Sequence, residues 1–407
     1  MINWDDPLNT NKENNKLIKT LTESYAKSDV LNNSFQQQEK SVEIEAKSPV
    51  GKPMDSLQKI ANNDYTTTNK ATSIESIKAS DKRVINGLAD VNQLAPFKYP
   101  WAWEYFLNAN KNHWTPLDIN MAQDVHDYQH SLTDNEKHVY TNVLAYLTTS
   151  DILAMRNIGL AVMEKMTAPE LQIYQARQVY EEALHTWTYQ HCIETIGLDQ
   201  SEIYNRYRVV PEINTKIQLA NRRLNSILRS DIDLTNQDEL NNFVMAYSFF
   251  AGIFEGCWFY NGFTPIFSLQ RRGLMKGTSE QLQYIMRDEV LHASFGIRVV
   301  KQIMLENEVT LDPKAIREVW DESEAAEIGY AQYILKEPIL GYSANDHIEQ
   351  FRFIANRRAR QLGFKEPFPG AKNCTPWLDE QANMRKEKNF FETRVTEYQT
   401  GGALDWD

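Results

Sequence analysis

Cysteine is scarce in this sequence, which has only Cys192, Cys257 and Cys374 among its 407 residues. None of them belongs to a C-x-x-C pair, and three cysteines cannot build the disulfide framework of a small secreted protein. Because such low cysteine usage is typical of a reducing compartment, we expect a cytoplasmic protein.

Basic clusters and long apolar runs are missing as well. The net charge of −12 argues against general binding to nucleic acid or to an acidic membrane surface. The first residues, Met1 to Asp6, lack the basic patch and apolar run of a signal peptide. No stretch of about 18 apolar residues is evident, so we expect no membrane span.

Glycine is also infrequent, with 16 residues, whereas aromatic residues make up 11% of the chain. Both values favour long, well-packed helices over a loop-rich β fold. Neither strand alternation nor a glycine-rich phosphate-binding motif is present over a useful length. The sequence therefore predicts an all-α protein without a nucleotide-binding motif of its own.

Composition divides the chain into three parts. Residues 1–85 are polar and poor in large apolar residues, which predicts a largely disordered N-terminal extension. Residues 86–363 have helical patterning and form the predicted helical domain. Residues 364–407 are expected to form a strap followed by a flexible tail with an aromatic, acidic tip.

Capping signals predict where the helices begin. Thr133 and Glu136 form a capping box, which predicts a helix through Asp151, and Pro169 suits the first turn of a helix ending near Gly197. The other predicted starts are Thr235 for a helix through Glu255 ending by Pro265, Thr278 with Gln281 for a helix through Glu289, and Asp312-Pro313.

Two of these helices carry the same short motif, E-x-x-H. One copy pairs Glu182 with His185, and the other pairs Glu289 with His292. Residues at i and i+3 share a helix face, so each motif points a carboxylate and an imidazole the same way. A single copy is weak evidence, since it also occurs on solvated helix faces, but two copies are typical of di-metal helical bundles.

Such a bundle needs one further carboxylate from each of two other helices. Glu255 is a candidate because it is the only charge in a long apolar run, and Asp151 is the second candidate. Four carboxylates would neutralise two divalent ions, as a buried site requires. Mixed oxygen and nitrogen ligands suit iron or manganese.

With these residues in place, residues 85 to 407 resemble the small subunit of class I ribonucleotide reductase. The resemblance implies a ferritin-like helical bundle with additional helices and a homodimer. It also implies two metal ions, expected to be iron with manganese possible. The implied ligands are Asp151, Glu182 and His185 for one ion and Glu255, Glu289 and His292 for the other.

The resemblance also implies roles for residues around the metals. Tyr189, one turn after His185, corresponds to the family's radical tyrosine, whereas relatives with a mixed Mn/Fe centre typically have Phe there. Trp114 and Asp288 match the electron path to the metal-bound histidine. The residues that match the apolar pocket of the radical are Phe259, Phe263 and Ile285. Each could instead be an ordinary core residue.

A partner is implied because the chain has no terminal cysteine pair for ribonucleotide reduction. The resemblance implies that a large subunit carries the nucleotide chemistry and binds the C-terminal tail, Ala403 to Asp407. Tyr398 matches the family's relay tyrosine. The implied enzyme is a ribonucleoside-diphosphate reductase, an oxidoreductase active only with its large subunit.

Two other functions share part of this pattern. A ferritin-like di-iron oxidase or oxygenase with its own small substrate would use the same six ligands, but would need neither Trp114 with Asp288 nor a docking tail. A metal-storage protein or helical scaffold would have little use for an apolar pocket around Tyr189.

Overall fold

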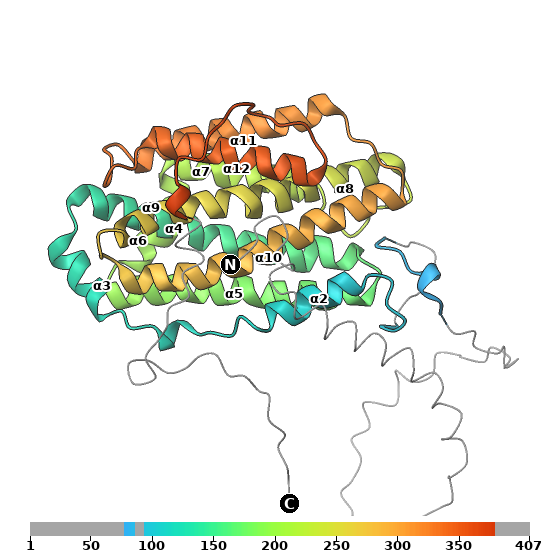
Figure 1. The fold of residues 1–407 in the computed structure, drawn as a ribbon, viewed down its shortest axis with the longest axis horizontal. Helices are drawn as coiled ribbons and strands as arrows, with labels where there is room; N and C mark the ends of the chain where they lie inside the picture. Colours follow the sequence, from blue (N-terminus) through green and yellow to red (C-terminus); the bar gives the residue numbers. More distant parts are fainter. Residues whose placement is uncertain (1–76, 86–92, 379–407) are drawn as a thin grey trace, which may run out of the picture. The chain divides into compact units, whose positions relative to one another are not determined.

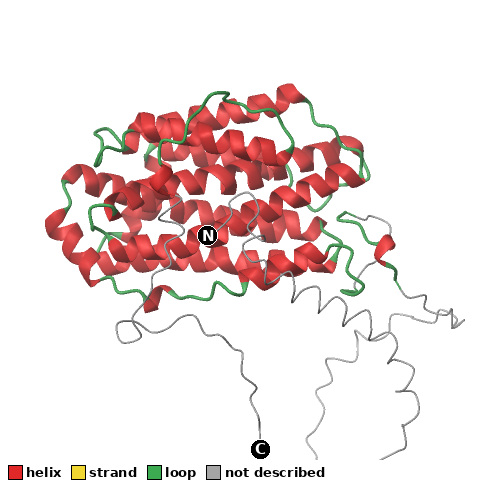
Figure 2. Ribbon diagram, in the orientation of Figure 1, coloured by secondary structure: helices red, strands yellow, loops and turns green. Residues whose placement is uncertain are grey.

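A computed structural model describes residues 77–85 and 93–378. The predictions for residues 1–76, Tyr398 and the tail lie outside these described residues. Within them the structure contains helices and no strand (Figure 2), in agreement with the all-α prediction. The helices are α2 (Pro100–Ala109), α3 (Ala122–His126), α4 (Asp134–Asn157), α5 (Pro169–Ile196), α6 (Gln200–Val209), α7 (Pro211–Asn225), α8 (Gln237–Phe249), α9 (Tyr260–Gln270), α10 (Lys276–Glu306), α11 (Pro313–Ile334) and α12 (Ala344–Leu362).

Shorter or irregular helical segments connect or extend these helices. The 3₁₀ segments are η1 (Ala79–Asp81), η2 (Pro116–Asp118) and η5 (Met163–Lys165), and the π-helical segments are η3 (Asp127–Ser131), η4 (Ile158–Val162) and η6 (Phe250–Phe259).

Three predicted helix starts are confirmed. Thr133 caps α4, with its hydroxyl accepting from the Glu136 backbone N–H in a capping box. Pro169 is the first residue of α5, which ends at Gly197 in the left-handed conformation with φ of 83°. Asp312 caps α11 through the Lys314 N–H.

The prediction for α8 is wrong at both ends. The cap is Asn236, whose side chain accepts from two backbone N–H groups of the first turn. The Thr235 hydroxyl donates instead to Asp233. Beyond α8 the helix continues through η6 and α9 past Pro265 to Gln270. Proline removes one backbone hydrogen bond, but burial on all sides keeps this segment helical.

The predicted start of α10 at Thr278 is also wrong. The helix begins at Lys276, and its first N–H groups are capped by another part of the chain. Asp124 on α3 accepts hydrogen bonds from the backbone N–H groups of Gly277 and Thr278 and from the Thr278 hydroxyl. A local pattern could not reveal a cap that only the tertiary fold brings into place.

Four helical segments surround the interior of the bundle: α4, α5, η6 and α10. Helix α5 packs against α4 and α10, and α10 packs against η6. In Figure 1 these segments run side by side, with α11 and α12 along one edge of the bundle. Residues far apart in sequence therefore face a common core.

The helix Gln237–Gln270, made of α8, η6 and α9, is long and apolar enough to cross a membrane by length and composition alone. The sequence analysis did not expect such a segment. In the fold, 94% of its most apolar window is buried against other helices. Core helices of soluble proteins have the same property, so this helix is weak evidence for a membrane span.

The segment 77–85 lies within the predicted N-terminal extension, yet its end packs into the helical domain. Lys82 is fully buried, and its ammonium lies 3.4 Å from a carboxylate oxygen of Glu170 at the start of α5. The Val84 carbonyl accepts a hydrogen bond from the Thr167 N–H at 2.9 Å. These contacts fix the chain before it enters α2.

Candidate metal centre

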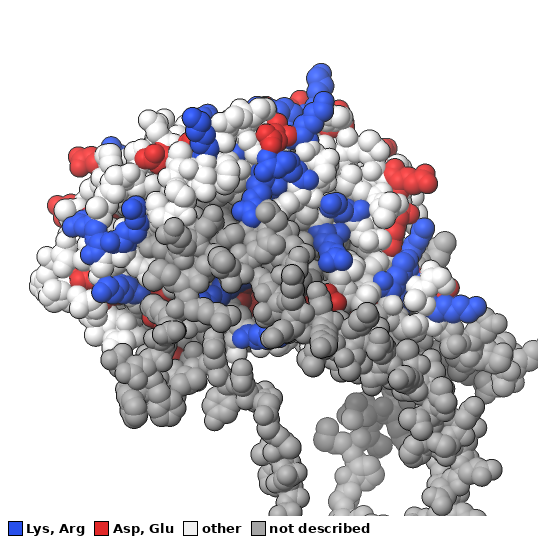
Figure 3. All heavy atoms as spheres, viewed as in Figure 1, with Lys and Arg blue, Asp and Glu red and all other residues white. Residues whose placement is uncertain are grey.

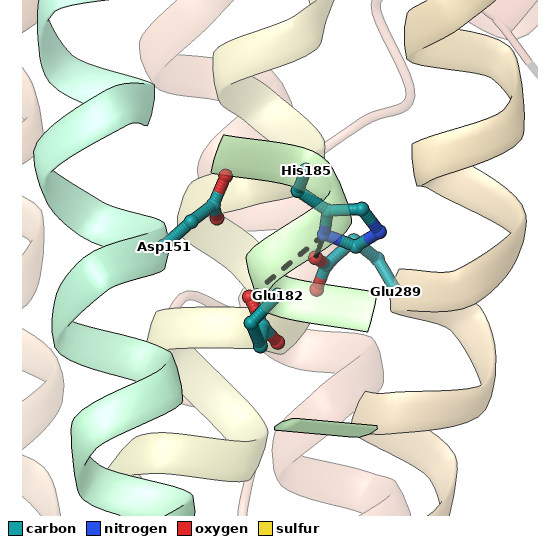
Figure 4. A group of neighbouring side chains, drawn as sticks. All are labelled: Asp151, Glu182, His185 and Glu289. Atoms are coloured by element: carbon teal, nitrogen blue, oxygen red, sulfur yellow. Dashed lines mark ion pairs between the residues drawn. The ribbon is translucent and has the colours of Figure 1, made fainter. Parts of the chain in front are cut away.

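The structure brings together all six residues that the sequence analysis selected as metal ligands. They come from four segments: Asp151 from α4, Glu182 and His185 from α5, Glu255 from η6, and Glu289 and His292 from α10. Every one is buried, with at most 1% of its surface exposed. Figure 4 shows Asp151, Glu182, His185 and Glu289 pointing toward one another from three helices.

Two overlapping groups have ligand atoms within 4.8 Å of one another. The first consists of Asp151, Glu182, His185 and Glu289, and the second of Glu182, Glu255, Glu289 and His292. Glu182 and Glu289, the carboxylates of the two E-x-x-H motifs, belong to both groups. The geometry therefore fits a pair of neighbouring cations with two shared carboxylates.

Both imidazoles direct Nδ1 into this centre. Nδ1 of His185 lies 3.3 Å from Glu289 and 3.8 Å from Glu182. Nδ1 of His292 lies 3.1 Å from Glu182 and 3.7 Å from Glu255. A neutral imidazole with its proton on Nε2 would leave Nδ1 free to bind a metal.

The outward Nε2 atoms each contact an acidic residue on the opposite motif helix. Nε2 of His185, on α5, lies 3.1 Å from Asp288 on α10. Nε2 of His292, on α10, lies 2.9 Å from Glu181 on α5. The sequence analysis predicted Asp288 but missed Glu181. The missed signal was an acidic residue directly before the glutamate in both motifs.

A second residue that the sequence analysis missed is Gln178, also on α5. Its amide nitrogen donates to both carboxylate oxygens of Glu255 at 3.1 Å. Gln178 is buried and lies one turn before Glu182. The contact fixes Glu255, which the π-helical segment η6 carries into the centre.

Among the described residues, no lysine or arginine pairs with the carboxylates of the two groups. Both oxygens of Asp151, Glu182 and Glu289 lack a hydrogen-bond partner among the described residues. Burial, followed by the charge of Glu289, raises the pKa of Glu182 to about 7. Burial, followed by the charge of Glu182, raises the pKa of Asp151 as well. Four buried carboxylates, three of them with unpartnered oxygens, fit two divalent cations.

In contrast to the carboxylates of the centre, the surface charges of this chain are exposed to solvent. Figure 3 shows lysine and arginine side chains mixed with acidic ones over the visible part that the structure describes. Half-exposed pairs such as Arg317 with Asp321 contribute little to stability, because water screens them. The six candidate ligands lie beneath this surface and have no such screening.

Tyr189 lies on α5 one turn after His185 and is fully buried. Its hydroxyl makes no hydrogen bond of 3.5 Å or less with a described residue, and the carboxylate of Asp151 is its neighbour. Burial and then the charge of Asp151 raise the pKa of Tyr189 well above its usual value, which places the phenol within electrostatic reach of the centre.

The predicted pocket residues Phe259, Phe263 and Ile285 are buried as well. The rings of Phe259 and Phe263 are stacked, with centroids 6.4 Å apart. Both belong to the continuous helix of η6 and α9, beyond Glu255. They extend the buried apolar part of this helix beyond Glu255.

The structure also brings Trp114 and Asp288 together. The indole Nε1 of Trp114 donates to Asp288 at 3.4 Å, and the Asn112 amide donates to the other oxygen of the same carboxylate. On its other side Trp114 stacks on Tyr284 at 5.3 Å between centroids. A continuous path of contacts thus runs from Tyr284 through Trp114 and Asp288 to His185.

The fold and this buried carboxylate–histidine group define a ferritin-like helical protein. The sequence profile of the family "Ribonucleotide reductase, small chain" matches residues 91–375. The chain therefore belongs to the ribonucleotide reductase small-chain family, whose members are subunits of an oxidoreductase.

Individual relatives agree with this assignment. The ribonucleoside-diphosphate reductase subunit beta of Chlamydia pneumoniae is 37% identical over 82% of this chain and 97% of that protein. The small subunit of Dictyostelium discoideum is 30% identical over 76% of this chain and 87% of that protein. The fold is similar to that of the R2 subunit from Clostridium botulinum, with a TM-score of 0.68 at 23% identity, covering 74% of this chain and 95% of the other.

Proposed function

We propose that this chain generates and stores a tyrosyl radical at Tyr189 and passes it to a large subunit for the reduction of ribonucleotides to deoxyribonucleotides. One observation carries the proposal: a buried phenol beside the Asp151 carboxylate lies within reach of the charges of a buried di-metal ligand set. An oxidisable side chain in a dry pocket beside redox-active metals is what radical storage requires.

Each motif helix supplies a carboxylate and a histidine to one of the two metals in this proposal. Asp151, Glu182 and His185 would hold one ion, and Glu255, Glu289 and His292 the other. Iron is the expected metal and manganese the alternative, because both accept mixed oxygen and nitrogen ligands. With dioxygen, the two ions would supply a one-electron oxidising power that no side chain possesses.

We assign the radical, its proton acceptor, its apolar pocket and an electron route to residues of this chain. Tyr189 gives up one electron and its phenolic proton, and the neighbouring carboxylate of Asp151 is placed to receive the proton. Phe259, Phe263 and Ile285 exclude water from the radical. The contact between Trp114 and Asp288 supports a route for a second electron.

The cysteines support the assignment of nucleotide chemistry to another chain. Cys192 and Cys257 are buried in helices, and burial raises the pKa of Cys192 to about 12. Such thiols form little thiolate at neutral pH and cannot reach a nucleotide. Cys374 is the third cysteine and is partly exposed. In the proposal the chain acts as a homodimer, Tyr398 relays the radical, and Ala403 to Asp407 dock on the large subunit.

The proposal is tested by reconstitution of the full chain with Fe(II) and dioxygen, followed by addition of the large subunit. We expect deoxyribonucleotide product only when both subunits are present. Deletion of residues 399–407 should abolish binding to the large subunit while the radical still forms. Product formed by this chain alone would refute the proposal, and so would full activity of the truncated chain.

A further inference from the structure

A second buried charged group lies outside the metal centre. Lys216 on α7 is fully buried, and its Nζ lies 2.6 Å from Oε2 of Glu327 on α11. The other oxygen of Glu327 accepts from the Asn261 amide at 2.7 Å and lies 2.7 Å from Nε2 of His347. Burial raises the pKa of Glu327, but the charge of Lys216 and the other partners lower it to about 2. The carboxylate is therefore ionised.

Three aromatic rings enclose the ammonium of Lys216. Nζ lies 3.9 Å from the ring centroid of Tyr146, 4.4 Å from that of Tyr330 and 4.8 Å from that of Trp258. We call these three rings the cage. Each distance lies within the range of a cation–π interaction. Buried ion pairs are often less stable than apolar packing, so the presence of a lysine here calls for a specific role.

A cation at this distance makes the cage rings poor electron donors. Removal of an electron from a ring leaves a positive charge, and the ammonium repels it strongly in a low-dielectric interior.

Ring contacts connect the cage to Phe259, one of the residues predicted to line the pocket of the radical. Trp258 follows Glu255 by three residues on η6, and its ring lies 6.1 Å from that of Phe254, which lies 5.2 Å from that of Phe259. Burial, followed by the charge of Glu327, raises the pKa of Tyr146, and Asp151 contributes to the same shift. Tyr146 is thus within electrostatic reach of both charged groups.

We propose that Lys216 determines which side chain is oxidised, because its ammonium withholds the electrons of the cage rings and leaves Tyr189 as the donor. This inference rests on the proposed function. In the permitted step Tyr189 would give one electron to the oxidant that the bound metals and dioxygen supply, and its proton to the Asp151 carboxylate. In the suppressed step Trp258 would give one electron to the same oxidant and become a radical cation.

Tyr189 and the two cage tyrosines have different charged neighbours. Tyr189 lies among the carboxylates Asp151, Glu289 and Glu182, whose negative charge would offset that of the bound metal ions. Tyr146 and Tyr330 instead place their ring faces on an ammonium. The cage rings therefore differ from Tyr189 in having a positive charge directly over their faces.

The test removes both charges of the pair, since Lys216→Met alone would leave a buried carboxylate uncompensated. The full-length double variant Lys216→Met/Glu327→Gln is loaded with Fe(II), exposed to dioxygen and freeze-quenched for EPR, with ring-deuterated tryptophan to identify the radical. We expect a tryptophan radical and a loss of Tyr189 radical by about threefold or more. Adding Trp258→Phe should remove the tryptophan signal, and Lys216→Arg, which retains the charge, should give the unsubstituted yield.

An unchanged Tyr189 yield in the folded, metal-loaded double variant would overturn the inference. A second measurement does not depend on the folding of that variant: Tyr189→Phe with the cage intact should show no radical on Trp258, and a Trp258-dependent signal there would also overturn it. The unsubstituted chain separates the proposed function from the role of Lys216. Absence of any tyrosyl radical in that chain would refute the proposed function itself.

Discussion

Glu181 on α5 lies 2.9 Å from the Nε2 atom of His292 on α10, and this contact crosses between the two motif helices. Asp288 makes the reciprocal contact with His185. Each motif helix therefore orients the histidine of the other. The two acids have different hydrogen-bond donors: Arg177 donates to Glu181, whereas Trp114 donates to Asp288.

Loss of Glu181 should weaken binding of one of the two ions. Partners of this kind fix ligand orientation, and their removal typically lowers metal affinity by about 10- to 100-fold. We expect such a loss for Glu181→Ala in titrations of the apo protein, and a smaller one for Glu181→Gln. Glu194→Ala, which changes an exposed acid on the same helix, is the control. Equal affinities in all variants would contradict the role of Glu181.

Metal binding should strengthen as pH rises toward neutrality. The pKa of Glu182 in the metal-free protein is about 7, raised first by burial and then by Glu289, so its proton must leave before a cation can bind. Burial lowers the pKa of His185 and His292, but hydrogen bonds with carboxylates outweigh burial and raise it. Both histidines must therefore also lose a proton before they bind a metal, so the metal affinity again rises with pH.

Below about pH 7 the apparent affinity should therefore rise by about tenfold or more per pH unit. Calorimetry of the apo protein in buffers of different ionisation enthalpy would report both the affinity and the protons released. A pH-independent affinity between about pH 5.5 and 7, with no proton release, would show that these groups do not bind the metals.

Gly296 marks the close approach of α10 and η6. A Cβ atom at this position would lie 2.6 Å from the Cβ of Ala251, so one helix would have to shift. We expect Gly296→Ala to lower the free energy of unfolding by about 1–3 kcal/mol. In Gly329→Ala, where nothing lies within 4 Å of the added Cβ, we expect a gain of about 0.5–1 kcal/mol. Denaturant unfolding of both variants measures the difference, and equal effects would exclude a packing constraint at Gly296.

Much of the helical framework and of the ligand set could be predicted from the sequence, because both depend on local spacing. The i, i+3 spacing of Glu182 and His185 places them on one face, and the cap at Thr133 uses residues of a single turn. Glu255 was identified as the only charge in an apolar run, and this needs no knowledge of the fold.

The residues that sequence reasoning missed act through contacts between distant segments. Asp124 caps α10 from 153 residues away, and Gln178 reaches Glu255 across 77 residues. The π-helical segment η6 likewise packs against the distant helices α10 and α12. Periodicity reports which face of a helix is buried, but it does not report what lies opposite that face.

The central claim is that Tyr189 is the residue oxidised by the metal centre. The most direct measurement loads the apo protein with Fe(II), admits dioxygen and records EPR and visible spectra of the chain alone. We predict a tyrosyl radical that Tyr189→Phe abolishes at unchanged metal content, and that Tyr180→Phe, at an exposed position on the same helix, retains. A di-iron spectrum without any radical, or a tyrosyl signal that persists in Tyr189→Phe, would contradict the account.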